Sequence, residues 1–482
     1  MDKLTGLDAS FLFSEEPRTP MHVGGVQFYL PADGKFDFEH MRETIRARLH
    51  LSKVFRRRLV HAPMDVGRPR WIEDPDFDLD FHVRHDGLPA PGGPDELRAY
   101  VSRFFSIPLD PERPLWALTF VDGLGDIDGC PPGCFALVYK VHHSAVDGMA
   151  TLDMLNALAD PPADAPEPDA SADTWHPDKV PGKLGMLWQS YLGALREPAE
   201  TVRAVSDLVV GGARVGREIL SGEHQRPAAR LTAPKTPFNA SVSANRILGA
   251  TMFPLDQIRH IRKKVRGSTV NDVVLSLCAG ALRRYLSEIG ELPDESLVGM
   301  VPIAVRDDVD EGGNRVSAMT LSLETTESDS LRRLRLIHEH TVDSKAYSQA
   351  LGARTLTDSA EAVPFGLGVV AARLYTRLHV ADYLRPFFNI ILTDVPGPRE
   401  KKYLGGAEMQ STYGMAPVMD GLGAIIVITS YVDKLYVSIY ACRDLLPDVS
   451  LFLDGLKTEY QELLRSIDDL PGKESHAESS RQ

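Results

Sequence analysis

The sequence predicts an α/β protein made of two halves that each mix strands with helices. Short apolar runs with strand periodicity alternate with longer segments in which apolar residues recur every three or four positions, and both patterns occur on either side of a central linker. With 482 residues, 43% of them hydrophobic, the chain is long enough for two or three domains with sizeable cores. The linker is the aperiodic stretch 160–181, rich in Pro, Ala and Asp.

These patterns set the expected domain limits. We predict an N-terminal subdomain over residues 1–160, a connecting region over 161–240, a C-terminal subdomain over 241–470 and a disordered polar tail over 471–482. The connecting region holds an amphipathic helical segment at 184–195, with the apolar positions Leu184, Leu187, Trp188, Tyr191, Leu192 and Leu195. Packing of this stripe on the protein is one interpretation, and contact with a lipid surface is the other.

In the first half, the predicted strands precede or follow turn signals. Strands are expected at 21–30, 70–75, 77–83, 114–121 and 134–142, and helices at 37–51 and 96–105. The strand 114–121 should pair with 134–142 across the intervening loop. Three consecutive arginines, Arg56 to Arg58, are interpreted as a solvated surface or as a contact for an anionic ligand.

The second half repeats the mixture without a recognisable sequence repeat. Strands are predicted at 246–254, 297–305, 314–324, 388–393, 423–430 and 434–441, and helices at 255–265, 273–286, 330–347, 363–378 and 449–464. The strand 388–393 ends in a rigid turn that contains two prolines.

Composition excludes several classes of function. A net charge of −14 argues against nucleic acid as a partner, and four cysteines do not form a disulfide framework in a chain of this length. The N-terminus has no basic region followed by a long apolar core, and no run of about 18 apolar residues occurs. We therefore expect the protein to work in the cytoplasm or at the face of a lipid phase.

One stretch, VHHSAVDG from Val141 to Gly148, concentrates residues capable of chemistry. It joins the predicted strand 134–142 to a segment with helical spacing, so it forms a strand-to-helix turn of the kind that often carries functional side chains. His143 is suited to general base catalysis because histidine titrates near neutral pH. Asp147 is placed to cap the helix or to pair with a distant cation, and Gly148 allows close approach of another backbone. Two other interpretations are a structural histidine pair and a metal site.

The motif HHSAVDG resembles the HHxxxDG motif of the CoA-dependent acyltransferase superfamily. Other stretches are similar to the bacterial wax ester synthase/diacylglycerol acyltransferase family, in the expected order along nearly the whole chain. They are LDASFLF followed by TPMHVGGVQFY, the PLW sequence Pro114-Leu115-Trp116, the ND pair Asn271-Asp272 in TVNDVV, VPIAVRDD followed by GGNRVS, and DVPGP. Asp394, which begins DVPGP, departs from the family's usual Asn.

The resemblance implies a fold and a reaction. It implies two chloramphenicol-acetyltransferase-like subdomains around a central substrate tunnel, acyl-CoA as co-substrate, and diacylglycerol or a long-chain alcohol as acceptor. No permanently bound cofactor and no metal are implied. His143 would be the general base, His142 and Gly148 would shape the turn, and Asp147 would be structural, with Arg306 as our first candidate for its partner.

The resemblance also suggests residues for substrate binding. Asn271 and Asp272 would support the tunnel or position substrate, with a helix cap as the equal alternative, and Pro114, Leu115 and Trp116 would line it or pack a strand. Our own hypothesis for the CoA phosphates is the basic cluster before the ND pair, whose alternative is a solvated helix face: Arg259, Arg262, Lys263, Lys264 and Arg266.

Two rival functions stay open at this point. One is a superfamily acyltransferase that acts on another alcohol or an amine, and the other is a non-catalytic lipid-inclusion protein that kept the fold. Since the acceptor of the family barely dissolves in water, we expect peripheral binding to lipid inclusions or to the inner membrane face through the helix 184–195.

Overall fold

The structure is a computed structural model of the chain. It describes residues 2–32, 36–61, 68–146, 148–161, 175–179, 182, 232–304, 316–351 and 365–469. Asp147, Arg306, the helical segment predicted at 184–195 and the tail predicted to be disordered lie outside the described residues.

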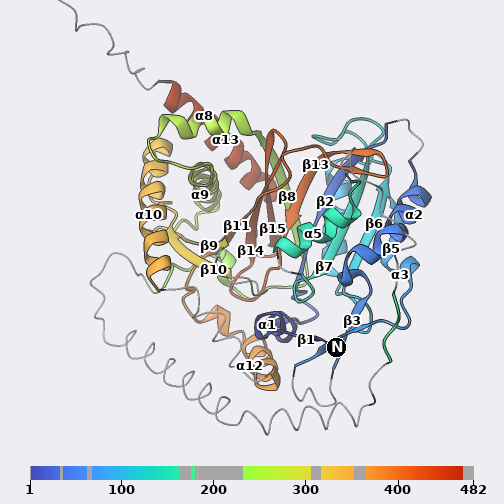
Figure 1. Cartoon of the computed structure of the whole chain (residues 1–482). Helices are drawn as coiled ribbons and strands as arrows, with labels where there is room; N and C mark the ends of the chain where they lie inside the picture. Colours follow the sequence, from blue (N-terminus) through green and yellow to red (C-terminus); the bar gives the residue numbers. More distant parts are fainter. Residues whose placement is uncertain are drawn as a thin grey trace, which may run out of the picture.

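The first of two large sheets carries the histidine motif. Its strand order is β12-β13-β2-β7-β6-β5, and all neighbours are antiparallel except β5 and β6. The strands are β2 (His22–Leu30), β5 (Val83–Gly87), β6 (Trp116–Asp122), β7 (Phe135–His142), β12 (Tyr403–Leu404) and β13 (Ala407–Met415). Its helices are α2 (Phe38–Arg48), α4 (Pro94–Ser106) and α5 (Gly148–Leu158), and α5 runs beside β2 and β7 in Figure 1. Every residue of β7 is buried, which its nearly continuous apolar sequence explains.

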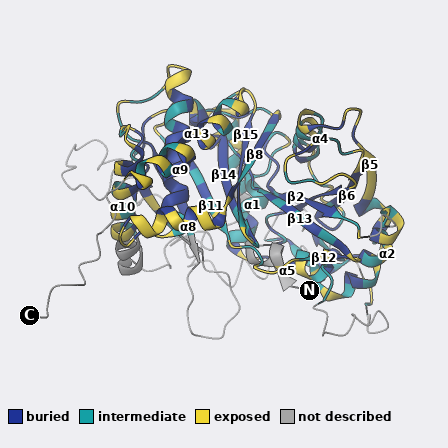
Figure 2. Ribbon diagram, turned by 90° about the horizontal axis from the view of Figure 1, so that it is seen from above, coloured by how far each residue is buried: buried dark blue, intermediate teal, exposed yellow. Residues whose placement is uncertain are grey.

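The second sheet has the order β10-β9-β11-β14-β15-β8. Its strands are β8 (Arg246–Pro254), β9 (Val298–Ala304), β10 (Val316–Ser322), β11 (Ile390–Val395), β14 (Ala424–Tyr431) and β15 (Lys434–Cys442). The accompanying helices are α8 (Leu255–Lys264), α9 (Val270–Glu288), α10 (Ser330–Leu351) and α13 (Val449–Asp468). Because α9 is apolar on most sides, it lies among α8, α10 and α13, whose outer faces are exposed in Figure 2.

A strand exchange joins the two sheets. After β11 the chain crosses to the first sheet, where β13 pairs with β2 from Glu408 opposite Leu30 to Met415 opposite Gly24, and then returns as β14. The Gly405-Gly406 turn between β12 and β13 donates two hydrogen bonds of 2.7 Å to Asp160. Neither β12 nor β13 was predicted from the sequence. The predicted domain limits stay predictions.

Smaller elements surround these sheets. A three-stranded sheet combines β1 (Asp2–Lys3), β4 (Arg70–Glu73) and β3 (Arg57–Val60), and further helices are α1 (Gly6–Ser14), α12 (Phe365–Arg377) and the short η1 (Leu49–Leu51), η2 (Lys53–Phe55), η5 (Pro237–Asn239) and η6 (Val380–Asp382). In β3, Arg57 pairs with Glu73 at 3.1 Å and Arg58 with Asp74 at 2.9 Å.

Most predicted elements are confirmed to within a few residues, including the pairing of β6 with β7. The strand predicted at 77–83 is wrong. Residues Leu79–His82 form the short helix α3, and β5 begins only at Val83. The Asp78 side chain accepts a hydrogen bond of 3.0 Å from the Asp80 backbone and so caps the helix, which overrides the alternating apolar pattern.

Candidate active site

A cavity of about 170 Å³ lies between the two sheets and includes His143 in its wall. Strands β2, β7 and β13 and helix α5 supply one side, and β11, β14 and the turn after β11 supply the other. Its lining is Val23, Gly24, Gln27, Tyr29, Tyr139, His143, Leu155, Asn156, Ala159, Thr393, Val395, Gly397, Pro398, Lys402, Met409, Thr412, Gly414, Met415, Ala416, Val427, Thr429 and Ser430. The histidine therefore faces a space whose surface is mainly apolar but which also contains polar side chains such as Gln27, Asn156 and Lys402.

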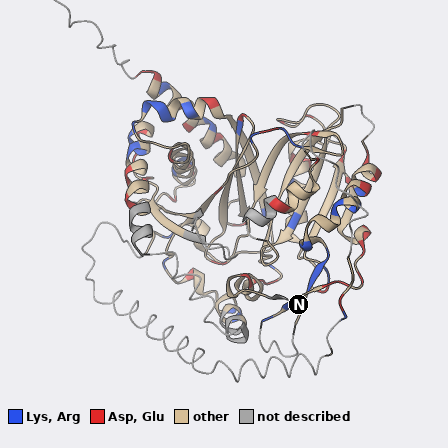
Figure 3. Cartoon of the chain, viewed as in Figure 1, with Lys and Arg blue, Asp and Glu red and all other residues tan. Residues whose placement is uncertain are grey.

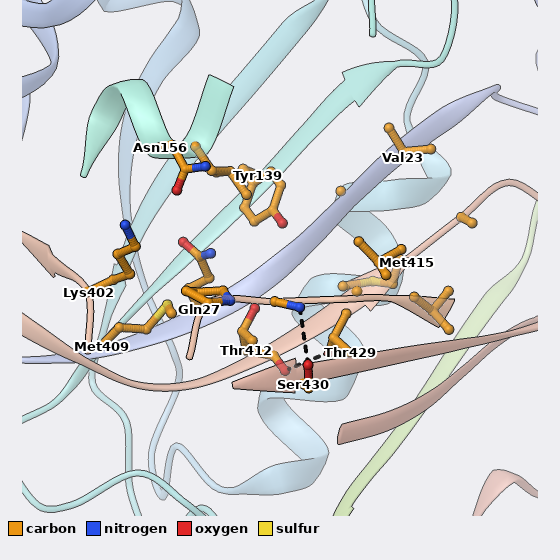
Figure 4. A pocket seen from close by; sticks show the side chains of 18 of the residues that line it. Val23, Gln27, Tyr139, Asn156, Lys402, Met409, Thr412, Met415, Thr429 and Ser430 are labelled. Carbon is orange, nitrogen blue, oxygen red and sulfur yellow. Dashed lines mark hydrogen bonds between the residues drawn. The ribbon is translucent and has the colours of Figure 1, made fainter. Parts of the chain in front are cut away.

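The strand register shows how the cavity extends along β2. Met415 lies opposite Gly24, close to the histidine end of β2, whereas Met409 lies opposite Tyr29 at the other end. From Val23 to Tyr29 an extended strand rises by ~20 Å. Figure 4 shows the same separation, with Met409 at one end of the cavity and Val23 at the other. The cavity is thus elongated, with His143 near one end.

His143 is held at the mouth of the turn by backbone and ring contacts. Its backbone N–H donates to the Met21 carbonyl at 2.8 Å, which fixes the chain directly after β7. The Phe11 ring of α1 stacks on the imidazole with a centroid distance of 3.8 Å and an interplanar angle of 11°. The half-buried imidazole is therefore oriented from one side and open to the cavity on another.

His142 points away from the cavity into the protein. Its Nδ1 accepts the Ser144 backbone N–H at 3.0 Å and lies 2.7 Å from the Ser144 hydroxyl, so the neutral ring carries its proton on Nε2. That nitrogen lies 3.3 Å from a Glu15 carboxylate oxygen. The two adjacent histidines therefore have different surroundings, and the first fixes the turn that presents the second.

A buried polar cluster supports this turn. The other Glu15 oxygen accepts the Met21 N–H at 3.2 Å and lies 3.7 Å from His22, whose pKa is well below its ordinary value because of burial, with Lys140 next in importance. Burial also lowers the pKa of Lys140 to about 7, and its ammonium donates to the carbonyls of Phe104 and Ile107. Glu15 and Phe11 were not predicted as site residues. The only sequence signal was that Phe11 belongs to the stretch LDASFLF, which resembles the family, and that Glu15 lies two residues after it.

The remaining members of the motif are only partly described. Gly148 is the first residue of α5, and its predicted role in shaping the turn stays a prediction. Asp147 and Arg306 lie outside the described residues, so their pairing stays a prediction.

The PLW residues pack behind the histidines. The Leu115 carbonyl accepts the His142 N–H at 2.9 Å, and the buried Trp116 indole donates to the Phe55 carbonyl at 2.9 Å. The His82 ring stacks on Trp116 with a centroid distance of 4.6 Å. Pro114 directly precedes Leu115 and Trp116. None of these three residues belongs to the lining of the described cavity. These contacts favour the strand-packing interpretation.

The ND residues begin α9. Asp272 is fully buried; its carboxylate accepts the Thr269 N–H at 2.8 Å and lies 2.9 Å from His338 Nδ1, while Thr269 caps the Asp272 N–H in return. This reciprocal arrangement is a capping box. Asn271 is half-buried, and neither residue lines the described cavity. The helix-cap alternative thus accounts for the contacts of Asp272.

The basic cluster lies on the outer face of the second half. Arg259, Arg262, Lys263 and Lys264 of α8 and the following Arg266 are exposed. The ribbon of α8 carries blue segments, which mark Lys and Arg, in Figure 3. None of them belongs to the lining of the described cavity. Their assignment to CoA phosphates stays a prediction.

Asp394 does not line the cavity, although its neighbours Thr393 and Val395 do. Alternation along β11 directs Asp394 to the opposite side, where its side chain keeps contact with solvent. Partial removal of water by the surrounding protein raises the pKa of its carboxyl above the ordinary value. The departure from the family's Asn therefore changes charge beside the cavity rather than within it.

The described residues lack two features, a metal-binding cluster and a membrane-spanning helix. No group of three or more His, Cys, Asp and Glu side chains is arranged to hold a metal ion in this part of the chain. Among the described helices, none combines the length and apolarity needed to cross a membrane.

Comparison with known proteins matches the chain to two family models. The wax ester synthase/diacylglycerol acyltransferase catalytic domain matches residues 4–274, and the C-terminal domain of the same family matches residues 312–464. The chain belongs to this family. It is therefore an acyltransferase, and the resemblance inferred from the motifs is confirmed.

Relatives match over nearly the full length of the chain. A putative diacylglycerol O-acyltransferase of Mycobacterium tuberculosis is 32% identical over 99% of this chain and 93% of its own length. The O-acyltransferase WSD of Acinetobacter baylyi is 31% identical over 96% of both chains. The solved wax ester synthase/diacylglycerol acyltransferase of Marinobacter aquaeolei VT8 has a TM-score of 0.71 and 28% identity, covering 97% of this chain and 100% of that one.

More distant structures share the fold alone. The first condensation domain of the calcium-dependent antibiotic synthetase gives a TM-score of 0.53 at 13% identity, over 97% of this chain and 96% of that chain. Together with the two mixed sheets and their helices, these matches confirm the predicted α/β fold of the chloramphenicol-acetyltransferase type.

Proposed function

We propose that this acyltransferase moves a fatty acyl group from acyl-CoA to the hydroxyl of diacylglycerol, of a long-chain alcohol, or of both. The products are triacylglycerol and wax ester. The single observation that carries the proposal is the position of His143 near one end of an elongated, mainly apolar cavity between the sheets. Such a space suits a long hydrocarbon chain, and the names of the relatives supply the reaction class.

In the proposed mechanism His143 acts as general base. It takes the proton of the acceptor hydroxyl as the oxygen forms a bond to the thioester carbonyl carbon. The carbon–sulfur bond then breaks, and the thiolate of CoA recovers the proton from the imidazolium. Acyl transfer is direct, without an acyl-enzyme. Holding both substrates beside one base lowers the barrier by proximity, an effect that reaches about 7–11 kcal/mol in favourable cases.

The neighbouring residues position this base. His142 and Gly148 shape the turn, and Glu15 with Ser144 holds His142 in one tautomer. Asp147 is assigned a structural role, with Arg306 as its proposed partner.

We assign the phosphates of CoA to the basic cluster of α8. CoA is a co-substrate here and not a resident cofactor. Charge-neutral substitutions of Lys263 and Lys264 should raise the KM for acyl-CoA and leave the KM for the alcohol unchanged, because only CoA is strongly anionic. An unchanged KM for acyl-CoA would refute this assignment.

The acceptor requires a lipid phase, since diacylglycerols and long alcohols barely dissolve in water. We propose peripheral binding to lipid inclusions or to the inner membrane face, with the amphipathic segment 184–195 as one contact. Replacement of Leu187, Trp188 and Leu192 by Ser should release the protein from lipid and spare activity on a short soluble alcohol.

A thioester-release assay tests the proposed function. Purified protein is given palmitoyl-CoA with hexadecanol, with a diacylglycerol, with an amine or with a small polar alcohol, and the ester products are identified by mass spectrometry. Wax ester or triacylglycerol formation is the expected result. Turnover only with the amine or small alcohol would identify a different acyltransferase of the superfamily, and no CoA release with any acceptor would indicate a non-catalytic protein.

A further inference from the structure

The segment from Arg373 to Phe387, here called the α12 surface, concentrates exposed apolar side chains. It comprises the end of α12, η6 and the following loop. Eleven large hydrophobic residues of the described chain are exposed, and six of them lie on this surface: Leu374 (55%), Tyr375 (38%), Leu378 (58%), Tyr383 (78%), Leu384 (57%) and Phe387 (63%). Exposed apolar residues scattered singly are ordinary, whereas a cluster of this kind marks a surface that something covers.

The charges of the α12 surface favour an anionic partner. Arg373, Arg377 and Arg385 are exposed, and Asp382 is the one acidic residue of the segment. The Asp382 carboxylate accepts the Ser241 N–H at 2.7 Å, and Arg385 forms an exposed ion pair with Glu295 at 3.4 Å. This segment is therefore locally cationic in a chain whose net charge is −14.

The α12 surface is anchored to the folded protein. The Arg18 guanidinium donates to the Thr376 carbonyl at 3.2 Å and to Asp420 at 2.8 Å, and Asp420 also accepts the Val242 N–H. On the inner side, Ala381 is buried. The exposed leucines and aromatic rings thus project from a fixed base.

The α12 surface is also connected to the catalytic turn. Helix α12 packs against α1, and the two lie side by side in Figure 1. Val369 of α12 joins the small apolar cluster that contains Ala9 and Leu12 of α1, and Phe11 of the same helix stacks on His143. Only one helix therefore separates α12 from the proposed base.

We propose that the α12 surface rests on a lipid surface with anionic headgroups, its aromatic and aliphatic side chains in the interfacial region and its arginines on the phosphates. Aromatic and aliphatic residues mixed with arginine suit this boundary. This proposal rests on the proposed function in one respect, because contact here brings the lipid that holds the acceptor next to α1 and His143. It adds a contact that is separate from the segment 184–195.

Vesicle binding tests the proposal without any turnover. The full-length chain is sedimented with vesicles of phosphatidylcholine alone and of phosphatidylcholine with phosphatidylglycerol. The wild type should bind the anionic vesicles more tightly. The variant L378S/Y383S/F387S should bind the anionic vesicles at least tenfold more weakly than the wild type. The affinity of R373Q/R377Q should fall about fivefold for each arginine replaced, and only on the anionic vesicles. These positions are strongly exposed, so circular dichroism spectra should be unchanged.

In a matched control, I107S/I289S/V342S, serine replaces three exposed apolar residues outside the α12 surface. This control should bind vesicles as the wild type does. The proposal is overturned if the α12 triple variant binds normally, if the control variant loses binding equally, or if vesicle charge has no effect. A concentration-dependent dimer that the α12 triple variant dissolves would show instead that a second copy covers the surface. If the wild type binds anionic vesicles as expected but shows no acyl transfer, the result counts against the proposed function and leaves the lipid contact standing.

Discussion

The turn after β7 and the start of α9 both place a polar motif where the chain enters a helix, yet their surroundings differ. His143 borders the cavity between the sheets, and its contacts come from Phe11 and Met21, far away in sequence. Asp272 has no exposed surface, and its carboxylate is hydrogen-bonded to Thr269 at the start of the same helix and to His338 of α10. We therefore expect a family motif at a helix start to carry chemistry only where the neighbouring elements leave space for a ligand.

Removal of His143 should give the largest effect. The variant H143A should lose about 10²–10⁴-fold in kcat, the usual contribution of a general base, while its melting temperature stays near that of the wild type. Acyl transfer from palmitoyl-CoA and thermal unfolding are the two measurements, with H142A as the milder comparison. Near-normal turnover in folded H143A would remove the difference between the two helix starts.

Acid should destabilise the packing behind the turn through His82. Burial lowers the pKa of His82 to about 4, against smaller opposing effects such as the hydrogen bond to the Trp116 carbonyl. The folded state keeps this ring neutral while the unfolded chain takes up a proton below about pH 6.5. Unfolding free energy should therefore fall by up to about 3 kcal/mol between pH 6.5 and pH 4. Urea titrations of the wild type and of H82Q test this, and an equal pH dependence in both would contradict the assignment.

Substitution of Asp272 should affect stability more than chemistry. The variant D272A loses the capping box and the contact with His338, which should cost about 2–3 kcal/mol in unfolding free energy. The neighbouring N271A serves as control and should change stability by less than about 0.5 kcal/mol. If D272A instead kept its stability and raised the KM of a substrate, the start of α9 would belong to the substrate site after all.

The smallest effect should come from Glu15. The substitution E15Q keeps the shape but removes the charge beside His142 Nε2, which weakens one contact by about 1 kcal/mol and should lower kcat about fivefold at unchanged KM. Steady-state kinetics of E15Q and of the charge-preserving E15D provide the measurement. A kcat equal to that of the wild type in E15Q would show that His142 holds the turn without this carboxylate.

Much of the fold near the motif could be predicted because its signals are local. The apolar run of β7 and the helical spacing after Gly148 lie within a few residues of the histidines, and they locate the turn. Phe11 and Glu15 could not be assigned, since their contacts with the histidines depend on where α1 packs. The end of the strand separates the two histidines. His142 is the last residue of β7 and is buried in the core, whereas His143 is the first residue beyond the strand.

The crossing strand was missed for a related reason. In β13 the buried positions Met409, Ser411, Tyr413 and Met415 alternate, but Ser411 interrupts the apolar pattern. Nothing in the local sequence says that the segment belongs to a sheet whose other strands lie in the first half of the chain. Its partner β2 ends at Leu30, so the pairing is decided by tertiary packing rather than by propensity.

The same strand sets the order in which the enzyme can be completed during synthesis. A nascent chain that has not yet released residues 407–415 from the ribosome leaves the outer edge of β2 unpaired, and exposed edges promote association with other chains. The turn that carries His143 therefore emerges early but cannot be enclosed until late, because β13 forms one wall of its cavity. Pairing over so long a sequence separation is slow, so the enzyme should gain activity only after the final strands and α13 have folded.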